Sequence, residues 1–100
     1  MNKKQIEELL SQVSEVFLSI EDDKIGEGYR MATLCLNPIQ NFIIELLELE
    51  ILDQESALML MTDLVESIEQ KDNVLLLDTF KYGIGTLLQD ILRIMEEDNE

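Results

Sequence analysis

The chain has 100 residues, with 22 Asp or Glu, seven Lys or Arg and no His, and its formal net charge is −15. This charge argues against nucleic acid and anionic membranes as partners, because both are bound by clustered Lys and Arg. Hydrophobic residues make up 46% of the sequence, so we expect one folded domain over residues 1–100 with an aliphatic core.

Residues 3–20 have the apolar spacing of an amphipathic helix. Their apolar residues recur at steps of three and four: Ile6, Leu9, Leu10, Val13, Val16, Phe17 and Ile20. Glu and Ser occupy the other side, which predicts a peripheral helix with one buried face. The acidic residues at positions 21–23 then indicate a turn.

Residues 24–52 continue a similar pattern through Pro38. The main stripe consists of Ile25, Tyr29, Ala32, Leu36, Ile39, Ile43 and Leu46. Proline in a helix removes a hydrogen bond and bends the chain, but a kinked helix keeps its phase. The unbroken phase favours one helix kinked at Pro38. The alternative is a break in which Asn37 caps a new helix, Pro38 occupies its first position and Gln40 completes a capping box.

The second helix also carries apolar residues away from its main stripe. Met31, Phe42 and Leu49 align on a second face. A helix that is apolar on several sides is buried on several sides. Either the helix is central in its own bundle, or a second chain covers this face.

Two further helices are predicted at residues 54–69 and 73–96. Asp53 and Asp72 precede them as N-caps. The third helix has the inner stripe Ala57, Leu58, Met61, Leu64, Val65 and Ile68, and the fourth has Leu77, Phe80, Ile84, Leu87, Leu88, Ile91 and Met95. Short connections force neighbouring helices to run antiparallel. The predicted fold is therefore all-α: an antiparallel four-helix bundle made of two helical hairpins.

The segment from Lys81 to Gly85 is unusual for a helix interior. Gly83 and Gly85 flank Ile84, and each glycine weakens a helix by about 1 kcal/mol relative to Ala. They predict close approach of another helix, either within the bundle or from a partner. Tyr82 projects to the polar side near Leu75, and this pair is a candidate contact point.

Carboxylates are the only abundant reactive groups, and their pattern predicts no metal or cofactor. Five acids lie between Glu45 and Glu55, but helical di-iron sites also need His and calcium loops need an ordered set of oxygen ligands with a glycine. Cys35 lies in an uncharged stretch and is expected to be a small buried residue. No nucleophile motif is present in the sequence, so we do not expect an enzyme.

The fourth predicted helix resembles the C-terminal helix of small acidic helical proteins of bacteria. The similarity lies in the run Lys71-Asp72-Asn73-Val74-Leu75-Leu76-Leu77-Asp78, continuing to Tyr82 and to Leu87-Leu88. It covers the last third of the chain best. Pro38, Gly83 and Gly85 depart from that pattern. The resemblance implies a helical fold, assigns no activity and transfers no site residues.

These observations favour a noncatalytic protein-interaction module that binds an amphipathic or basic segment or associates with itself. The candidate interface consists of Met31, Phe42, Leu49, Leu75 and Tyr82. Alternatives are a protein similar to export chaperones for a secreted subunit and an acidic nucleic-acid mimic. The start of the chain does not resemble a signal peptide, and the longest uncharged run, residues 31–44, is too short to span a bilayer. We therefore expect a cytoplasmic protein.

Overall fold

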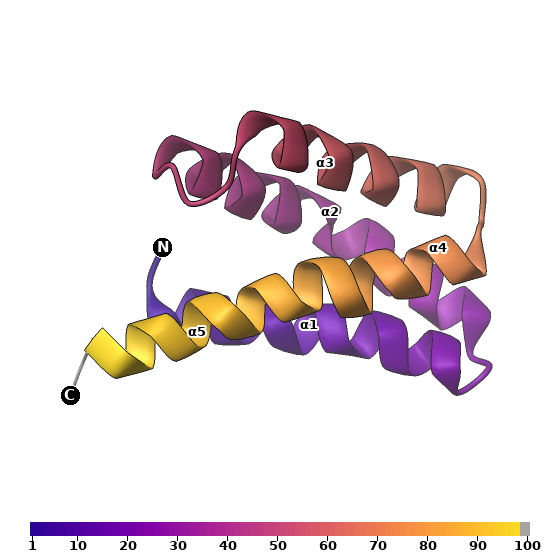
Figure 1. Ribbon diagram of the computed structural model, residues 1–100. Helices are drawn as coiled ribbons and strands as arrows, with labels where there is room; N and C mark the ends of the chain where they lie inside the picture. Colours follow the sequence, from indigo (N-terminus) through magenta and orange to yellow (C-terminus); the bar gives the residue numbers. More distant parts are fainter. Residues whose placement is uncertain (99–100) are drawn as a thin grey trace.

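The structure, a computed structural model, describes residues 1–98. Three helices, α1 (Lys3–Glu21), α2 (Ile25–Glu48) and α3 (Gln54–Glu69), precede a fourth helical rod. That rod joins α4 (Asn73–Leu77), the π-helix η1 (Asp78–Gly85) and α5 (Thr86–Asp98) end to end. Successive helices run antiparallel (Figure 1), which confirms the predicted all-α, four-helix arrangement.

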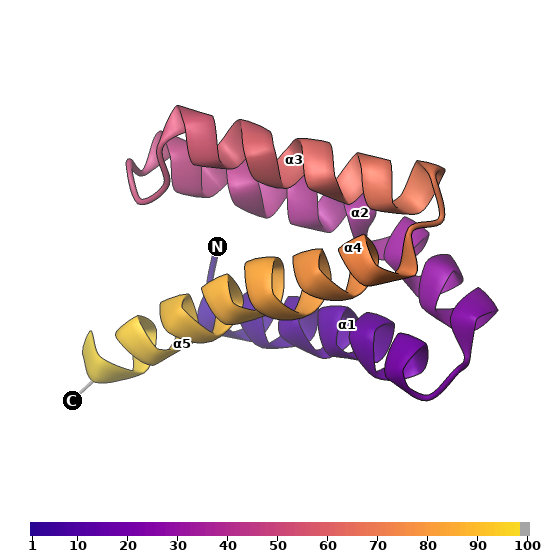
Figure 2. The same ribbon diagram turned by 45° about the vertical axis from the view of Figure 1, so that its right-hand side comes forward.

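The helices form two layers. In both views α2 lies beside α3, and α1 lies beside the fourth rod (Figures 1 and 2). Contacts between α1 and α2, and contacts of α3 with α4 and η1, connect the layers. Each connection between helices has three to five residues, which leaves no room for a parallel arrangement of neighbours.

The second helix passes through Pro38 without interruption. It is one helix of 24 residues with the proline inside it. Asn37 and Pro38 therefore do not start a new helix, and the continuous helix of the two alternatives is confirmed. Pro38 is exposed, so the hydrogen bond that its missing N–H removes lies on the solvent side of the helix.

The predicted end of α2 at residue 52 is wrong, because the helix stops at Glu48. Glu50 adopts a left-handed conformation with φ of 60°, and the backbone N–H of Ile51 donates to the carbonyl of Leu46 at 3.0 Å. This is a Schellman turn, in which the chain folds back onto the last helical carbonyls. Asp23 and Lys71 end α1 and α3 in the same way, with φ of 64° and 51°.

Polar side chains begin three of the helices. The carboxylates of Asp53 and Asp72 accept hydrogen bonds from the backbone of Ser56 at 2.7 Å and Leu75 at 3.1 Å, as the sequence predicts. Asn2 and Gln5 form a reciprocal capping box at the start of α1. These caps satisfy backbone donors that would otherwise have no intrahelical partner.

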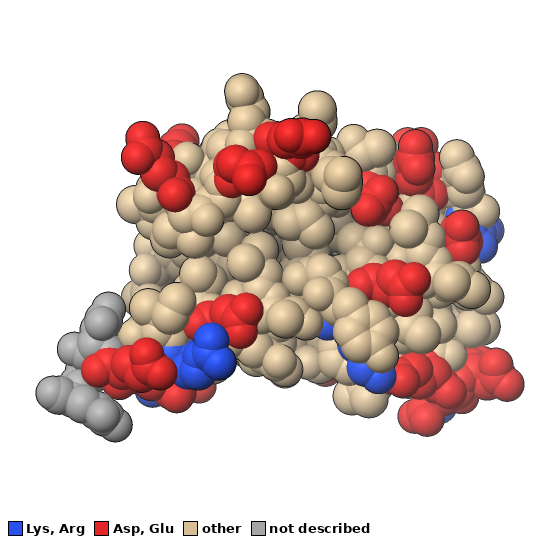
Figure 3. Space-filling model, in the orientation of Figure 1, with Lys and Arg blue, Asp and Glu red and all other residues tan. Residues whose placement is uncertain are grey.

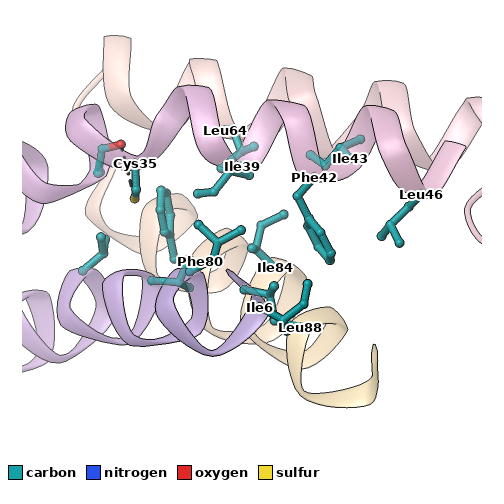
Figure 4. Close-up of a cluster of buried hydrophobic side chains, with 14 of the residues drawn as sticks. Ile6, Cys35, Ile39, Phe42, Ile43, Leu46, Leu64, Phe80, Ile84 and Leu88 are labelled. Carbon is teal, nitrogen blue, oxygen red and sulfur yellow. Dashed lines mark hydrogen bonds between the residues drawn. The ribbon is translucent and has the colours of Figure 1, made fainter. Parts of the chain in front are cut away.

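The core is aliphatic apart from Phe42, Phe80 and Cys35 (Figure 4). Its fully buried side chains come from all four helices. α1 presents one buried face as predicted, but it is not peripheral, because it contacts α2 and every segment of the fourth rod. The third helix contributes least, with Ala57 and Leu64 as its buried hydrophobic residues. Leu58 was expected inside, yet it is exposed. α3 is thus the peripheral helix of the bundle.

The middle of the fourth rod is π-helical over Asp78–Gly85, which the sequence analysis did not predict. Its buried side chains recur at steps of four residues: Leu76, Phe80, Ile84 and Leu88. In an α-helix, each such step overshoots a full turn by about 40°, so three steps rotate the stripe by about 120°. A π-turn closes its hydrogen bond over five residues and is wider, which keeps these four residues on the core side.

Position 85 of this π-helix has room for glycine but not for a side chain. A Cβ at position 85 would lie 2.8 Å from the carbonyl oxygen of Phe80, five residues earlier in the same rod. It would also lie 3.7 Å from the ring of Phe17 on α1, while a Cβ at position 83 would lie 3.3 Å from Leu60 on α3. The predicted close approach of another helix is confirmed at Gly83, whereas at Gly85 the closest atom belongs to the same rod and α1 lies at ordinary van der Waals distance. The neighbours of both glycines belong to this chain.

We expect Gly85→Ala to destabilise the fold by about 2 kcal/mol, because a backbone carbonyl cannot move aside as a side chain can. Gly28→Ala should be milder, since its new methyl group would meet Cδ1 and Cγ1 of the Ile20 side chain at 2.5 and 2.9 Å, and the nearest backbone atom, the carbonyl oxygen of Val16, at 3.4 Å. Gly26→Ala is the matched control: nothing lies within 4 Å of its Cβ, so the helix should gain up to about 1 kcal/mol. Urea unfolding followed by circular dichroism measures all three. A neutral Gly85→Ala would contradict the steric account of the π-helix.

The left-handed turns generate a second prediction. Glu50→Gly should stabilise the protein by about 0.5–1 kcal/mol, because glycine adopts positive φ without a Cβ penalty. Glu48→Gly removes the same charge from the last helical position and should instead destabilise by about 1 kcal/mol. Thermal unfolding of the two variants separates backbone conformation from charge. Equal changes in both would show that charge, not φ, determines the result.

Candidate functional site

The two layers separate at one end of the molecule. The third helix packs against α4 and η1, whereas α5 packs against α1 (Figure 1). Between the C-terminal end of α2 and α5 lies an apolar hollow of about 520 Å³. Its apolar lining consists of Leu46, Leu49 and Ile51 from the end of α2 and the following turn, and of Ile91, Ile94 and Met95 from α5.

Three of these side chains are largely open to solvent. Leu49 is 59% exposed, Ile51 is 54% exposed and Ile94 is 49% exposed. Leu49 and Ile51 face outward because the Schellman turn at Glu50 directs the chain away from the helix axis. Single exposed aliphatic residues are ordinary, but three from two elements around one hollow form a patch.

A second hollow of about 440 Å³ lies between α1 and α2. We call it the polar hollow, because Gln5, Glu8, Gln12 and Asn41 line it together with apolar residues. Met1 and Glu45 line both hollows. The amino group of Met1 lies 3.0 Å from Oε1 of Glu45, so an ion pair occupies the boundary between the two.

Acidic groups surround the apolar hollow. Figure 3 shows uncharged surface at this end of the molecule, with acidic groups above it and both acidic and basic groups below it. Glu48 and Glu50 are exposed and flank Leu49, and within residues 1–98 neither forms an ion pair. On the other side, Glu96 follows Met95 and pairs with Lys3 at 3.6 Å. The rim of the hollow is therefore mainly negative.

The structure distributes the predicted interface residues over different environments. Phe42 is only 3% exposed and belongs to the core, so its assignment to a surface was wrong: the chain's own helices cover it. Met31 and Leu75 are half-buried, and neither lines a hollow. Leu49 lies in the apolar hollow. Ile51 and Ile94 also line this hollow, and no sequence pattern indicated them. Their exposure depends on the residue at which α2 ends and on the part of the fourth rod that α3 covers.

Tyr82 is 65% exposed and lies in the π-helix, away from both hollows. The ammonium group of Lys81 lies 5.6 Å from the centre of its ring and 5.7 Å from that of Phe17. The same group donates to Glu21 at 2.9 Å, a hydrogen bond that raises the pKa of Lys81. Lys81 thus connects η1 to the end of α1 and orients the ring of Tyr82.

The remaining reactive groups are the carboxylates and one thiol. Across residues 1–98, no group of three His, Cys, Asp or Glu side chains is placed to bind a metal ion. Burial raises the pKa of the Cys35 thiol to about 11, so the thiolate is rare at neutral pH. None of the helices in the described part of the chain is long and apolar enough to cross a bilayer.

No protein-family model matches this chain, and neither a curated protein nor a solved structure matches it. The resemblance of the last third to small acidic helical proteins therefore leads no further than a small all-helical protein.

The charge distribution predicts an unusual response to salt. Five ion pairs connect described residues, and each has at least one partly exposed partner, so they contribute little. Repulsion among the surplus carboxylates should dominate instead. We expect the melting temperature to rise between about 0.01 M and 0.5 M NaCl, a range in which the screening length falls several-fold. Calorimetry at fixed pH measures this change, and a flat or falling curve would contradict it.

Proposed function

We propose that this chain is a noncatalytic protein-interaction module of the cytoplasm, and that the apolar hollow is its contact surface. The observation that carries this proposal is the group of three half-exposed aliphatic side chains, Leu49, Ile51 and Ile94, around one concave surface. Exposed apolar patches with a polar rim are typical of protein-binding sites.

The charge of the rim favours a different protein over a second copy of this chain. In a symmetric dimer the same patch faces itself, so Glu48 and Glu50 would approach their own counterparts. Like charges brought together at an interface are unfavourable by several kcal/mol. A partner with Lys or Arg beside its apolar residues avoids this repulsion and gains attraction.

Two other functions receive less support. A nucleic-acid mimic needs carboxylates spaced like phosphates on one continuous surface, yet the acids here lie on α1, α2, α3, η1 and α5 and in every connection. A chaperone for a secreted subunit would be a special case of the proposed module, because such a protein also covers an amphipathic helix of its client. The hollow would accommodate such a client, but it does not favour a secreted subunit over other protein partners.

The proposal is tested with two double variants. Leu49→Gln with Ile94→Gln changes the apolar hollow, and Leu58→Gln with Val74→Gln makes the same chemical change at exposed positions outside both hollows. Extracts of the source organism are cross-linked to each protein, and the bound proteins are identified by mass spectrometry. We expect a protein that is retained by the wild type and the control but lost with the hollow variant.

Light scattering during size-exclusion chromatography completes the test. We expect a monomer for all three proteins. A dimer that dissociates in the hollow variant would identify a second copy as the occupant, against the charge argument. If the wild type is monomeric and no protein depends on the hollow for binding, the proposed function is wrong.

A further inference from the structure

We propose that the apolar and polar hollows are two parts of one groove, and that this groove binds a single amphipathic helix with Lys or Arg beside its apolar face. The inference rests on the proposed function and specifies the chemistry of the partner. Its starting point is that Met1 and Glu45 line both hollows, so the two hollows adjoin at the ion pair that these residues form.

One face of α2 forms the floor of the groove. The residues of this helix and its C-cap that line the two hollows are spaced by three and one in alternation: Pro38, Asn41, Phe42, Glu45, Leu46 and Leu49. This spacing describes a straight stripe over three helical turns. At 1.5 Å per residue the stripe is about 17 Å long, which matches a partner helix of about three turns.

The walls of the groove also come from helices. Along the polar part, α1 contributes Gln5, Ile6, Glu8, Leu9 and Gln12, which share one face of that helix. Along the apolar part, α5 contributes Ile91, Ile94 and Met95, again at steps of three and four. A groove between helices that present such stripes is suited to another helix, whose side chains enter at the same period.

Charge along the groove determines which helix fits. Glu45 lies at its centre, Glu8 lines the polar part, and Glu48 and Glu50 flank Leu49 at the apolar end. Glu45 already accepts a cation, since the Met1 amino group lies 3.0 Å from its carboxylate. A Lys or Arg of a partner can take this position. An anionic lipid or an acidic helix would instead approach these four carboxylates with like charge.

The test uses a synthetic peptide of about 14 residues, long enough for almost four helical turns. It carries Leu at helical spacing on one face and Lys elsewhere, with both ends blocked. A second peptide replaces every Lys by Glu, and a third keeps the Lys and Leu composition but breaks the helical period. Fluorescence anisotropy measures binding to the full chain at about 0.15 M salt.

We expect the helical Lys peptide to bind best. The Leu49→Gln/Ile94→Gln variant should bind it about tenfold more weakly, because the two side chains line the hollow that the peptide's Leu residues enter. Glu45→Gln should weaken binding about threefold, as for a partly exposed ion pair. The controls Leu58→Gln/Val74→Gln and Glu66→Gln should bind as the wild type does. Circular dichroism checks that each variant is folded.

Several outcomes would contradict the proposed groove. Equal binding of the Glu peptide or of the aperiodic Lys peptide would exclude a basic helix as the occupant. Equal losses in the variants and their controls would show diffuse attraction to an acidic surface. If a cellular partner depends on Leu49 and Ile94 while the peptides do not distinguish Glu45→Gln from Glu66→Gln, the interaction module stands and the groove does not.

Discussion

Burial of aliphatic side chains is the interaction on which the rest of this structure depends. The fully buried residues are almost all Leu, Ile and Val, and the two buried polar ones, Ser67 and Thr79, belong to helices. Ser67 donates its hydroxyl proton to the carbonyl of Leu64 at 2.8 Å, so its burial leaves no unpaired donor. Electrostatics opposes this arrangement, because the net charge of −15 is distributed over a small surface with few ion pairs. The hydrophobic core must therefore offset both chain entropy and self-repulsion.

The placement of glycine and of the π-helix follows from that core. None of the four glycines has a positive φ, and all four lie inside helices, whereas Asp23, Glu50 and Lys71 adopt the left-handed turns that glycine would favour. Gly28 and Gly85 instead permit close contact, with Ile20 and with the carbonyl of Phe80. The π-turn keeps Phe80 and Ile84 inside at a spacing that an α-helix would rotate away from the core. Packing, rather than turn geometry, thus accounts for these glycines.

Much of the fold could be predicted from the sequence, because helix position and buried face are both encoded in local spacing. The stripe from Ile6 to Ile20, the N-caps Asp53 and Asp72 and the passage of α2 through Pro38 all follow from such patterns. The end of α2 could not be located in this way, since Leu49, Ile51 and Leu52 continue the apolar run and no glycine precedes the turn. Phe42 was misplaced because a second apolar face can be covered by the same chain or by another one. The open end depends on the packing of α3 against α4 and η1 and on the packing of α5 against α1, and α1 and α5 lie at opposite ends of the sequence.

The apolar hollow and the surplus of carboxylates would together make the protein selective for its partner. An apolar hollow alone would bind any exposed hydrophobic segment, including a second copy of this chain. A rim of carboxylates repels a second copy of this chain and attracts a cationic partner. The same charges therefore weaken self-association and strengthen binding of the partner. The acids near Leu49 weaken the isolated fold through repulsion, and a basic partner would remove that repulsion when it binds. Binding at this end would therefore stabilise the whole bundle through charge neutralisation as well as through burial of the hollow.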